Sequence, residues 1–260
     1  MTLDEHYASI FTGAPEPSGT RKPSDRPLPT KTCFIAMLPR TGSSMLCSIF
    51  EQTGVMGFPD EYLNPRGPMQ MWRDRNGSKN FTDYIDLLVR EKSTDNGVFS
   101  LKATYRDAAP ILGRGLTSKV FPAPRFVYLN RHDMIAQAIS GHKANSSGVW
   151  HRKADGTPYR LTKPTIQEPV YDREEILKLM DEYAREQVLW EKFFVLHQIK
   201  PLRLSYEDLC DNLQRSLSQI FEFMDVAAPT NLASIMSATK RLSDDINQRW
   251  VAEFLKTFTL

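Results

Sequence analysis

Residues 31–54 read KTCFIAMLPRTGSSMLCSIFEQTG. The first eight of them, 31–38, are a short and mostly apolar run that is typical of a strand buried on both faces. Residues 39–42 predict a tight turn, and from Ser43 to Thr53 the apolar side chains recur at helical spacing until Gly54 ends the helix. A strand, a tight loop and a helix in this order indicate the opening of a phosphate-binding α/β domain.

The same two patterns continue along the chain. Short apolar runs predict three further strands, at 97–102, 125–129 and 201–204. Helical spacing and capping residues predict helices at 81–92, 133–143, 172–194, 205–225 and 248–256. Because strands alternate with helices, we expect an α/β fold with a mostly parallel central sheet flanked by helices on both faces. Residues 55–80 and 145–170 are expected to be long irregular loops, and loops of that length are usually functional or disordered.

The first thirty residues have a different composition from the rest. They contain five prolines, spaced among serine, glycine and charged residues. Such a segment does not propagate a helix or a sheet ladder, so we expect an extended Pro-rich arm at 1–30 and a single α/β domain at 31–260. Two interpretations of the arm stay open: a flexible tail, or a segment that packs on the partner subunit of a homodimer.

Composition limits the classes of function. Among 260 residues, 33 Lys and Arg face 31 Asp and Glu, and the formal net charge of +2 excludes a broadly basic nucleic-acid binder. Three cysteines without a CxxC pair indicate no disulfide framework, which favours a reducing, cytoplasmic location. The five histidines lack metal-binding spacing, so we expect no metal. With no apolar stretch near ~18 residues and no signal-peptide pattern, we expect no transmembrane segment.

The loop after the first strand carries the strongest chemical signal. A helix N-terminus has unpaired N–H groups and a partial positive charge, and it therefore binds anions. Gly42 lets the backbone approach a ligand closely, Arg40 adds a positive charge, and Ser43 and Ser44 add hydroxyl donors. This combination predicts a phosphate-type ligand, while an ordinary turn with a serine cap is the plainer alternative.

Two other functions compete at this loop. A P-loop kinase or NTPase carries GxxxxGK[ST], whose lysine reaches the outer phosphates. Here Met37 stands at the first glycine position and Ser43 at the lysine position, which disfavours that class. A non-catalytic nucleotide-binding module would keep the loop and would need no catalytic base.

Five segments together resemble the sulfotransferases that use 3′-phosphoadenosine-5′-phosphosulfate (PAPS), and most closely the bacterial trehalose 2-sulfotransferase-like family. They are RTGSS at 40–44, TGVMGFPDEY at 53–62, GVFSLK at 97–102, NRHDMIAQAIS at 130–140 and LSYEDL at 204–209. The resemblance covers about residues 31–255 and implies a P-loop-like sulfotransferase fold.

The resemblance implies roles for residues that bind the nucleotide. The 5′-phosphosulfate would be cradled by Arg40, Thr41, Gly42, Ser43 and Ser44. Arg131 and Ser140 would hold the 3′-phosphate. Nine residues of helix turn through about 900°, so that pair converges only if Arg131 precedes the helix. Lys102 would stabilise charge on the leaving phosphate oxygen, and Arg249 would close over the nucleotide.

The resemblance also implies a general base, Glu61, which would take the proton of the acceptor hydroxyl, with Arg40 stabilising the transferring group. His151 in the second long loop is the alternative base, because many sulfotransferases use histidine. Tyr62, Trp150 and His151 are candidates for contact with a sugar, since aromatic faces commonly pack against sugar rings.

The predicted activity is therefore sulfuryl transfer from PAPS to a hydroxyl of a carbohydrate, glycolipid or lipopolysaccharide acceptor by in-line displacement. The chemistry requires no metal ion, and no nucleic acid is expected as a partner. Which hydroxyl receives the sulfuryl group is a property of the two long loops.

Overall fold

The computed structural model describes residues 1–13, 28–112, 121–152, 158–161, 168–235, 245–256 and 258. Its central sheet has four parallel strands in the order β2-β1-β3-β6. The strands are β1 (Lys31–Met37), β2 (Val98–Ala103), β3 (Pro124–Asn130) and β6 (Leu202–Ser205). The first strand therefore has a parallel neighbour on each side, which confirms the prediction of a parallel sheet.

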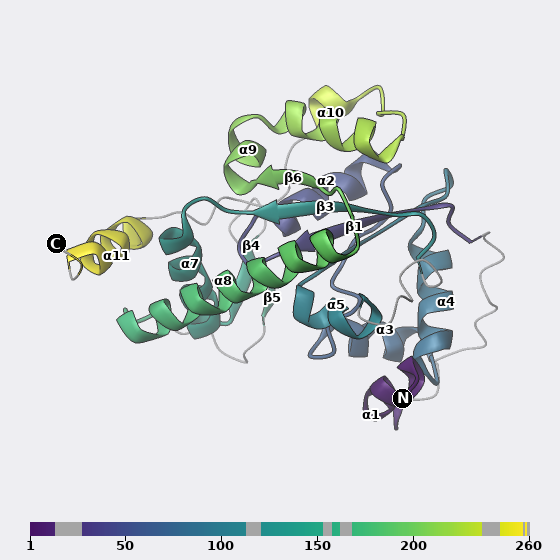
Figure 1. The fold of residues 1–260 in the computed structure, drawn as a ribbon, viewed down its shortest axis with the longest axis horizontal. Helices are drawn as coiled ribbons and strands as arrows, with labels where there is room; N and C mark the ends of the chain where they lie inside the picture. Colours follow the sequence, from purple (N-terminus) through teal and green to yellow (C-terminus); the bar gives the residue numbers. More distant parts are fainter. Residues whose placement is uncertain are drawn as a thin grey trace.

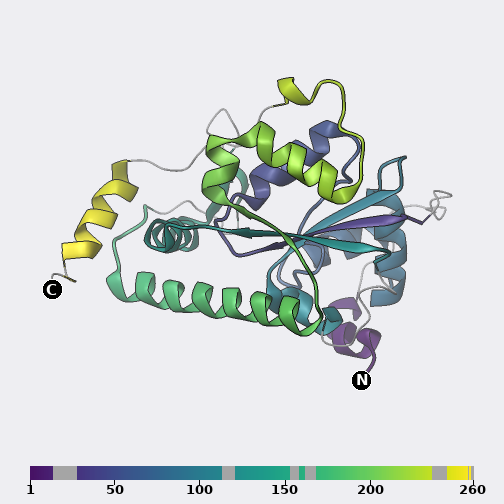
Figure 2. The same ribbon diagram turned by 45° about the horizontal axis from the view of Figure 1, so that its top comes forward.

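Helices cover both faces of this sheet, as the alternation of elements predicts (Figures 1 and 2). One face carries α2 (Ser43–Thr53), α9 (Tyr206–Asp211) and α10 (Leu213–Met224). The helices of the other side are α1 (Leu3–Phe11), α3 (Pro68–Asn76), α4 (Phe81–Lys92), α5 (Tyr105–Leu112), α7 (Met134–Ser147) and α8 (Arg173–Leu196). A short 3₁₀ turn, η1 (Leu232–Ser234), follows α10, and α11 (Asp245–Lys256) packs on α7.

The two cores are built from alternate residues of β1. Cys33, Ile35 and Met37 belong to the cluster that includes α2 and α10. Phe34 and Ala36 belong to the larger cluster with α4, α5 and α8. Successive side chains of a strand point to opposite faces, so a strand that is apolar at every position requires cover on both sides.

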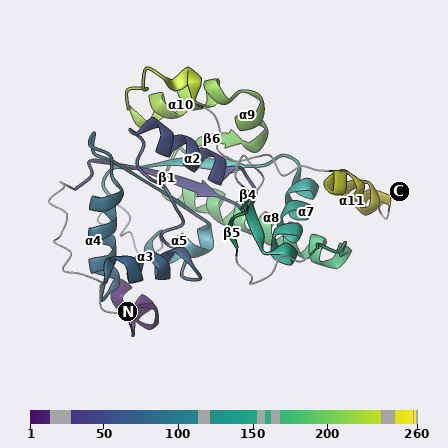
Figure 3. The ribbon, with the colours of Figure 1, turned by 180° about the vertical axis from the view of Figure 1, so that it is seen from behind.

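The N-terminal segment differs from the expected extended arm. Residues 3–11 form α1, which begins with a capping box between Thr2 and Glu5 and buries Tyr7 and Phe11. The five prolines that indicated an extended segment all follow residue 14, so they place no restriction on this helix. Figure 3 shows α1 beside α3 and α4, and Tyr7 stacks on Phe81 at a centroid distance of 4.5 Å. Residues 14–27 of the predicted arm lie outside the described residues.

Both long loops contain regular elements that the sequence reading did not predict. Within 55–80 lies α3, which starts with Pro68 at its first turn and ends at Gly77 in the left-handed conformation. Within 145–170 lie β4 (Val149–Arg152) and β5 (Pro158–Leu161), which pair antiparallel. The predicted helix at 205–225 is two helices, α9 and α10, with a break at Asn212.

Among the described residues, no helix is long and apolar enough to cross a membrane.

Candidate active site

The loop between β1 and α2 has the conformation that an anion site requires. Gly42 is the N-cap of α2 at a φ of +81° and, being glycine, brings no side chain to cap that helix end. A Cβ at Gly42 would lie 3.1 Å from Cδ2 of Tyr206, so the position has little room for a side chain. Arg40 also has a positive φ, +67°, which is uncommon outside glycine. A helix that starts in this way has the N–H groups and the partial positive charge of its first turn at the loop, which is the arrangement that binds anions.

Four hydrogen bonds hold this loop from behind. The Thr41 hydroxyl donates to the carbonyl of Leu38 at 2.7 Å. Gln137 of α7 donates to the carbonyl of Pro39 at 2.8 Å, and Trp190 of α8 donates to the carbonyl of Met37 at 3.3 Å. Nη1 of Arg131 lies 3.4 Å from the carbonyl of Arg40. The main chain of the loop is thus fixed by α7, α8 and the segment after β3.

One group of polar residues gathers on the α7 side of the loop. Nε of Arg40 donates to the Ser140 hydroxyl at 2.9 Å, and Nη1 of Arg40 donates to the carbonyl of Trp150 at 2.5 Å. Burial lowers the pKa of Arg40 to about 10, and the charge of Arg131 contributes to the decrease. Two partly buried guanidinium groups and a hydroxyl at one place can hold an anion with more than one negative charge.

Arg131 lies in the segment between β3 and α7, before the helix starts. This is the position that convergence with Ser140 requires, and both residues contact Arg40. The Arg131 guanidinium stacks over the Tyr206 ring at 4.4 Å, and the Glu207 carboxylate is 4.0 Å from Nε. Nε itself is buried and makes no hydrogen bond within the described part of the chain. A buried unsatisfied donor is costly, and an anionic ligand is the natural partner for it.

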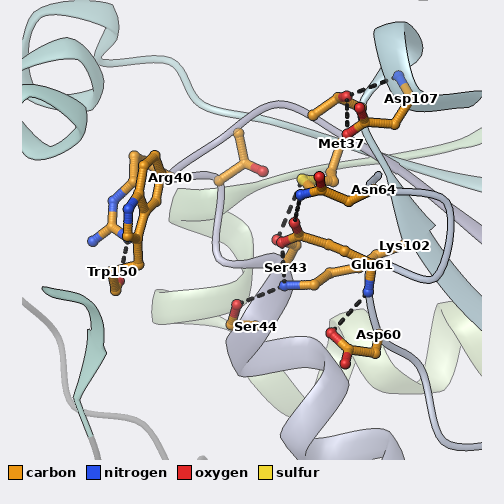
Figure 4. A network of polar contacts seen from close by, with 12 residues as sticks. Met37, Arg40, Ser43, Ser44, Asp60, Glu61, Asn64, Lys102, Asp107 and Trp150 are labelled. Carbon is orange, nitrogen blue, oxygen red and sulfur yellow. Dashed lines mark hydrogen bonds and ion pairs between the residues drawn. The ribbon is translucent and has the colours of Figure 1, made fainter. Parts of the chain in front are cut away.

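A second group lies on the β2 side of the loop (Figure 4). Nζ of Lys102, on β2, donates to the Ser44 hydroxyl at 2.8 Å and is 3.2 Å from Oε1 of Glu61. Burial disfavours the charge on Lys102, but Glu61 and, less strongly, Cys47 and Asp60 outweigh it and raise its pKa. The ammonium therefore stays charged at neutral pH, between the start of α2 and the Glu61 carboxylate.

The Glu61 carboxylate is held by its own loop as well. Asn64 Nδ2 donates to Oε2 of Glu61 at 2.9 Å, and the Glu61 amide donates to Oδ1 of Asp60 at 2.8 Å. Asp107 at the start of α5 is close enough to feel this group: burial raises its pKa, and the charge of Glu61 adds to the increase. A carboxylate that lies next to a buried lysine and near the loop between β1 and α2 can accept a proton from a group that binds at this loop.

Comparison with known proteins decides the family. The sequence profile of the Stf0 sulphotransferases matches residues 33–257. The chain belongs to the Stf0 sulphotransferase family. It is 22% identical over 265 residues to the trehalose 2-sulfotransferase of Mycolicibacterium smegmatis, which covers 83% of this chain and 91% of the relative. The resemblance predicted from the five motif segments is confirmed.

Three solved structures of sulfotransferases are similar to this chain at low sequence identity. A sulfotransferase from Mycobacterium avium is 14% identical, with 91% of this chain and 78% of that chain covered and a TM-score of 0.49. A sulfotransferase domain from the curacin biosynthetic pathway is 14% identical, covering 88% and 98%, with a TM-score of 0.48. A mouse sulfotransferase complexed with PAP is 11% identical, covering 91% and 70%, also with a TM-score of 0.48.

In this Stf0 sulphotransferase, the side chains of three residues predicted to cradle the 5′-phosphosulfate have partners within the protein. The Arg40 side chain points to Ser140 and the Trp150 carbonyl, on the α7 side of the loop, rather than to Glu61, and its role in stabilising the transferring group stays a prediction. The Thr41 hydroxyl is used within the loop. The Ser43 hydroxyl donates to Sδ of Met37 at 3.5 Å.

The predicted acceptor contacts also change. Tyr62 is only 1% exposed, packs in the aromatic core with Trp72 and Phe99, and donates its hydroxyl to the carbonyl of Phe58. A ring packed in this way offers no face to a sugar in this structure, which therefore gives no support to the prediction for Tyr62. Trp150 is half-buried on β4.

The structure does not support two further predictions, those for His151 and Arg249, for different reasons. His151 lies on β4, and its side chain is outside the described part of the structure. Arg249 is exposed on α11, a helix that packs on α7 through a hydrogen bond from Lys143 to Asn247. Its place there gives no support to a role in closing over the nucleotide.

Two residues of the site were missed by the sequence reading. Asn64, which follows the segment 53–62, donates to the Glu61 carboxylate. Gln137, which lies within the segment 130–140, donates to the carbonyl of Pro39 in the loop. The three-residue spacing of Asn64 from Glu61 was the available signal, because it is the spacing of a turn. Among the described residues, no group of three or more His, Cys, Asp and Glu side chains is arranged to hold a metal ion.

Proposed function

We propose that this sulphotransferase moves a sulfuryl group from PAPS to a hydroxyl of a carbohydrate. The observation that carries the proposal is the division of polar residues into two groups on either side of the loop at 38–42. Arg40, Arg131 and Ser140 lie on one side, and Ser44, Lys102 and Glu61 lie on the other. PAPS has a phosphate at two separate positions, which matches two separate anion sites joined by one helix N-terminus.

The residues present fit this nucleotide on two counts. Arg131 brings a buried Nε without a hydrogen bond among the described residues, and the N-cap of α2 is Gly42, which has no side chain to cap the helix. The chemistry that PAPS supplies when bound is an activated sulfuryl group, passed in line to the acceptor oxygen with adenosine 3′,5′-bisphosphate as the leaving group. Arg131 and Ser140 would hold the 3′-phosphate, and the α2 amides with Ser44 would hold the 5′ end.

The two residues on the β2 side, Glu61 and Lys102, would carry out the catalytic steps. Glu61 would accept the proton of the acceptor hydroxyl as the oxygen bonds to sulfur. Lys102 stays charged in its buried position, so it can stabilise the negative charge that develops on the phosphate oxygen. The relative from Mycolicibacterium smegmatis is named as a trehalose 2-sulfotransferase, which supports a saccharide as acceptor. Glycolipids and lipopolysaccharides carry the same hydroxyl chemistry.

The location in the cell is part of the proposal. Cys33 and Cys47 are buried and Cys210 is exposed, and all three are free thiols. Unpaired cysteines are usual in a reducing compartment, which supports the cytoplasm.

The function is tested by incubating the full chain with PAPS, without added metal, and with trehalose, other saccharides or lipopolysaccharide. We expect a sulfated product and adenosine 3′,5′-bisphosphate in equal amounts, detected by mass spectrometry. Transfer to none of these acceptors would contradict the proposal. Hydrolysis of ATP in the presence of Mg²⁺ would favour an NTPase instead.

Replacement of Arg131 by alanine tests the nucleotide site. In calorimetry, the native protein should bind adenosine 3′,5′-bisphosphate more tightly than AMP, because only the bisphosphate offers an anion to Arg131. The Arg131→Ala variant should lose about 10- to 150-fold in affinity for the bisphosphate, the range for hydrogen bonds to charged groups, and little for AMP. Arg203→Ala, which removes an exposed ion pair with Glu191, serves as the control. Equal affinities of the native protein for both nucleotides would refute the assignment.

A further inference from the structure

Asn64 holds the Glu61 carboxylate from the side opposite Lys102. Its Nδ2 is 2.9 Å from Oε2 of Glu61, while Lys102 Nζ is 3.2 Å from Oε1. Each carboxylate oxygen therefore has a hydrogen-bond donor from a different element, the loop before α3 and the strand β2. With both oxygens held, rotation about the last side-chain bond of Glu61 would break at least one of these contacts.

The orientation of the Asn64 amide is itself determined by its surroundings. Its Oδ1 accepts from the amide of Arg66 at 3.0 Å, so its Nδ2 is the end that faces Glu61. The Asn64 main chain is tied at both ends: its amide donates to the Glu61 carbonyl at 2.9 Å, and its carbonyl accepts from the amide of Met69 at 3.0 Å. Because Met69 is a buried residue of α3, these bonds anchor Asn64 to the core.

We propose that Asn64 is the positioning residue for Glu61, and that its amide keeps the carboxylate deprotonated and aimed at the acceptor hydroxyl. The proposal rests on the role of Glu61 in the proposed function. An Nδ2–H group can donate only to an oxygen that carries no proton at that lone pair, so the contact favours the form that acts as a base. If Asn64 had only a structural role, in the turn before α3, it would hold the main chain in place and would not affect the protonation of Glu61.

The charged and titratable groups that surround Glu61 come from several elements. They are Lys102 on β2, Cys47 on α2, Asp107 on α5, and Asp60 as the preceding residue. Lys102 is the positive charge in direct contact, and the acidic groups oppose it. Replacing the Asn64 amide by a carboxylate would remove a hydrogen-bond donor to Glu61 and would place a second negative charge beside the Glu61 carboxylate.

The test compares Asn64→Ala and Asn64→Asp in the full chain, with PAPS and trehalose as the probe substrates. Asn64→Ala should lower kcat at least tenfold, with the KM for trehalose and the affinity for adenosine 3′,5′-bisphosphate nearly unchanged. Asn64→Asp keeps the shape and the acceptor for the Arg66 amide, but like charges disfavour the deprotonated form. We therefore expect the acid limb of its kcat profile to move to higher pH by about one unit or more.

One control variant and one structural measurement keep the outcome interpretable. Asn212→Asp makes the same charge change at an exposed turn between α9 and α10, and it should leave the profile unchanged. A crystal structure of Asn64→Ala gives a readout that needs no acceptor: we expect the Glu61 carboxylate to leave its native contact with Lys102.

The results separate the inference from the proposed function. Native kcat and an unshifted pH profile in both Asn64 variants, together with an inactive Glu61→Gln, would overturn the positioning role and leave the base in place. An active Glu61→Gln would instead overturn the base. If no saccharide is sulfated, the crystal structure still decides, because an unmoved carboxylate in Asn64→Ala contradicts the inference.

Discussion

Replacement of Glu61 by glutamine should lower the turnover of sulfuryl transfer by about 10²- to 10⁴-fold, the usual contribution of a general base. Glutamine has nearly the same shape, but it cannot accept the proton of the acceptor hydroxyl. The residues proposed to hold the 3′-phosphate, Arg131 and Ser140, contact Arg40 on the α7 side of the loop, whereas Glu61 contacts Lys102 on the β2 side, so affinity for adenosine 3′,5′-bisphosphate should be kept. The measurement pairs a transfer assay with calorimetry on the same preparation.

The control for this result is another glutamate close in sequence. Glu51→Gln, on the exposed side of α2, should retain turnover within a few-fold of the native protein. Near-native turnover in Glu61→Gln would exclude that residue as the base. The next variant to measure would then be His151→Ala, because His151 is the alternative base that the sequence predicts.

Replacement of Gly57 by alanine should destabilise the fold by about 3 kcal/mol or more, a large part of the ~5–15 kcal/mol that stabilises a typical domain. Gly57 has a φ of +73°, and a Cβ there would lie 2.7 Å from the amide nitrogen of Ser100 on β2. Ser100 is buried in the sheet and donates its hydroxyl to the carbonyl of Met56. The strand or the loop must move to admit a methyl group.

Gly54 offers a matched control for this substitution. It has a similar φ of +66°, but a Cβ there would meet nothing within 4 Å. Gly54→Ala should therefore cost only the backbone strain, about 1–2 kcal/mol. The free energies of unfolding in urea, measured for both variants, decide between the causes. An equal loss in both would show that backbone strain, and not the close approach to β2, accounts for the effect at Gly57.

The elements that the sequence predicted well are those with a local signal. β1, the loop and α2 follow from one apolar run, one glycine and one helical repeat within 24 residues. α3 and α5 were missed for a physical reason. α3 lies in a segment rich in proline and glycine, where Pro68 and Gly77 start and end the helix rather than break it. α5 has a proline inside it, at Pro110, and is held at its start by Glu186 of α8, about 80 residues away.

In the candidate site, too, some features have a local signal in the sequence and others depend on distant residues. That Arg131 precedes α7 could be expected from helix geometry, because nine helical residues would separate it from Ser140. The direction of the Arg40 side chain could not, because it depends on a positive φ and on partners 100 and 110 residues away. Tyr62 was expected near the acceptor because it is aromatic and lies in the segment that the sequence predicts as a long loop. Its burial depends on how α3 and β2 pack around it, which no local pattern records.

The hydrogen bonds behind the loop have a consequence for the direction of its polarity. The carbonyls of four successive residues, Met37, Leu38, Pro39 and Arg40, each accept from a donor inside the protein: Trp190, Thr41, Gln137 and Arg131. The orientation of these four carbonyl groups is thus fixed by hydrogen bonds within the protein before any ligand binds. An anion that approaches the start of α2 meets N–H groups without an opposing row of oxygens, and the loop does not have to reorganise to receive it.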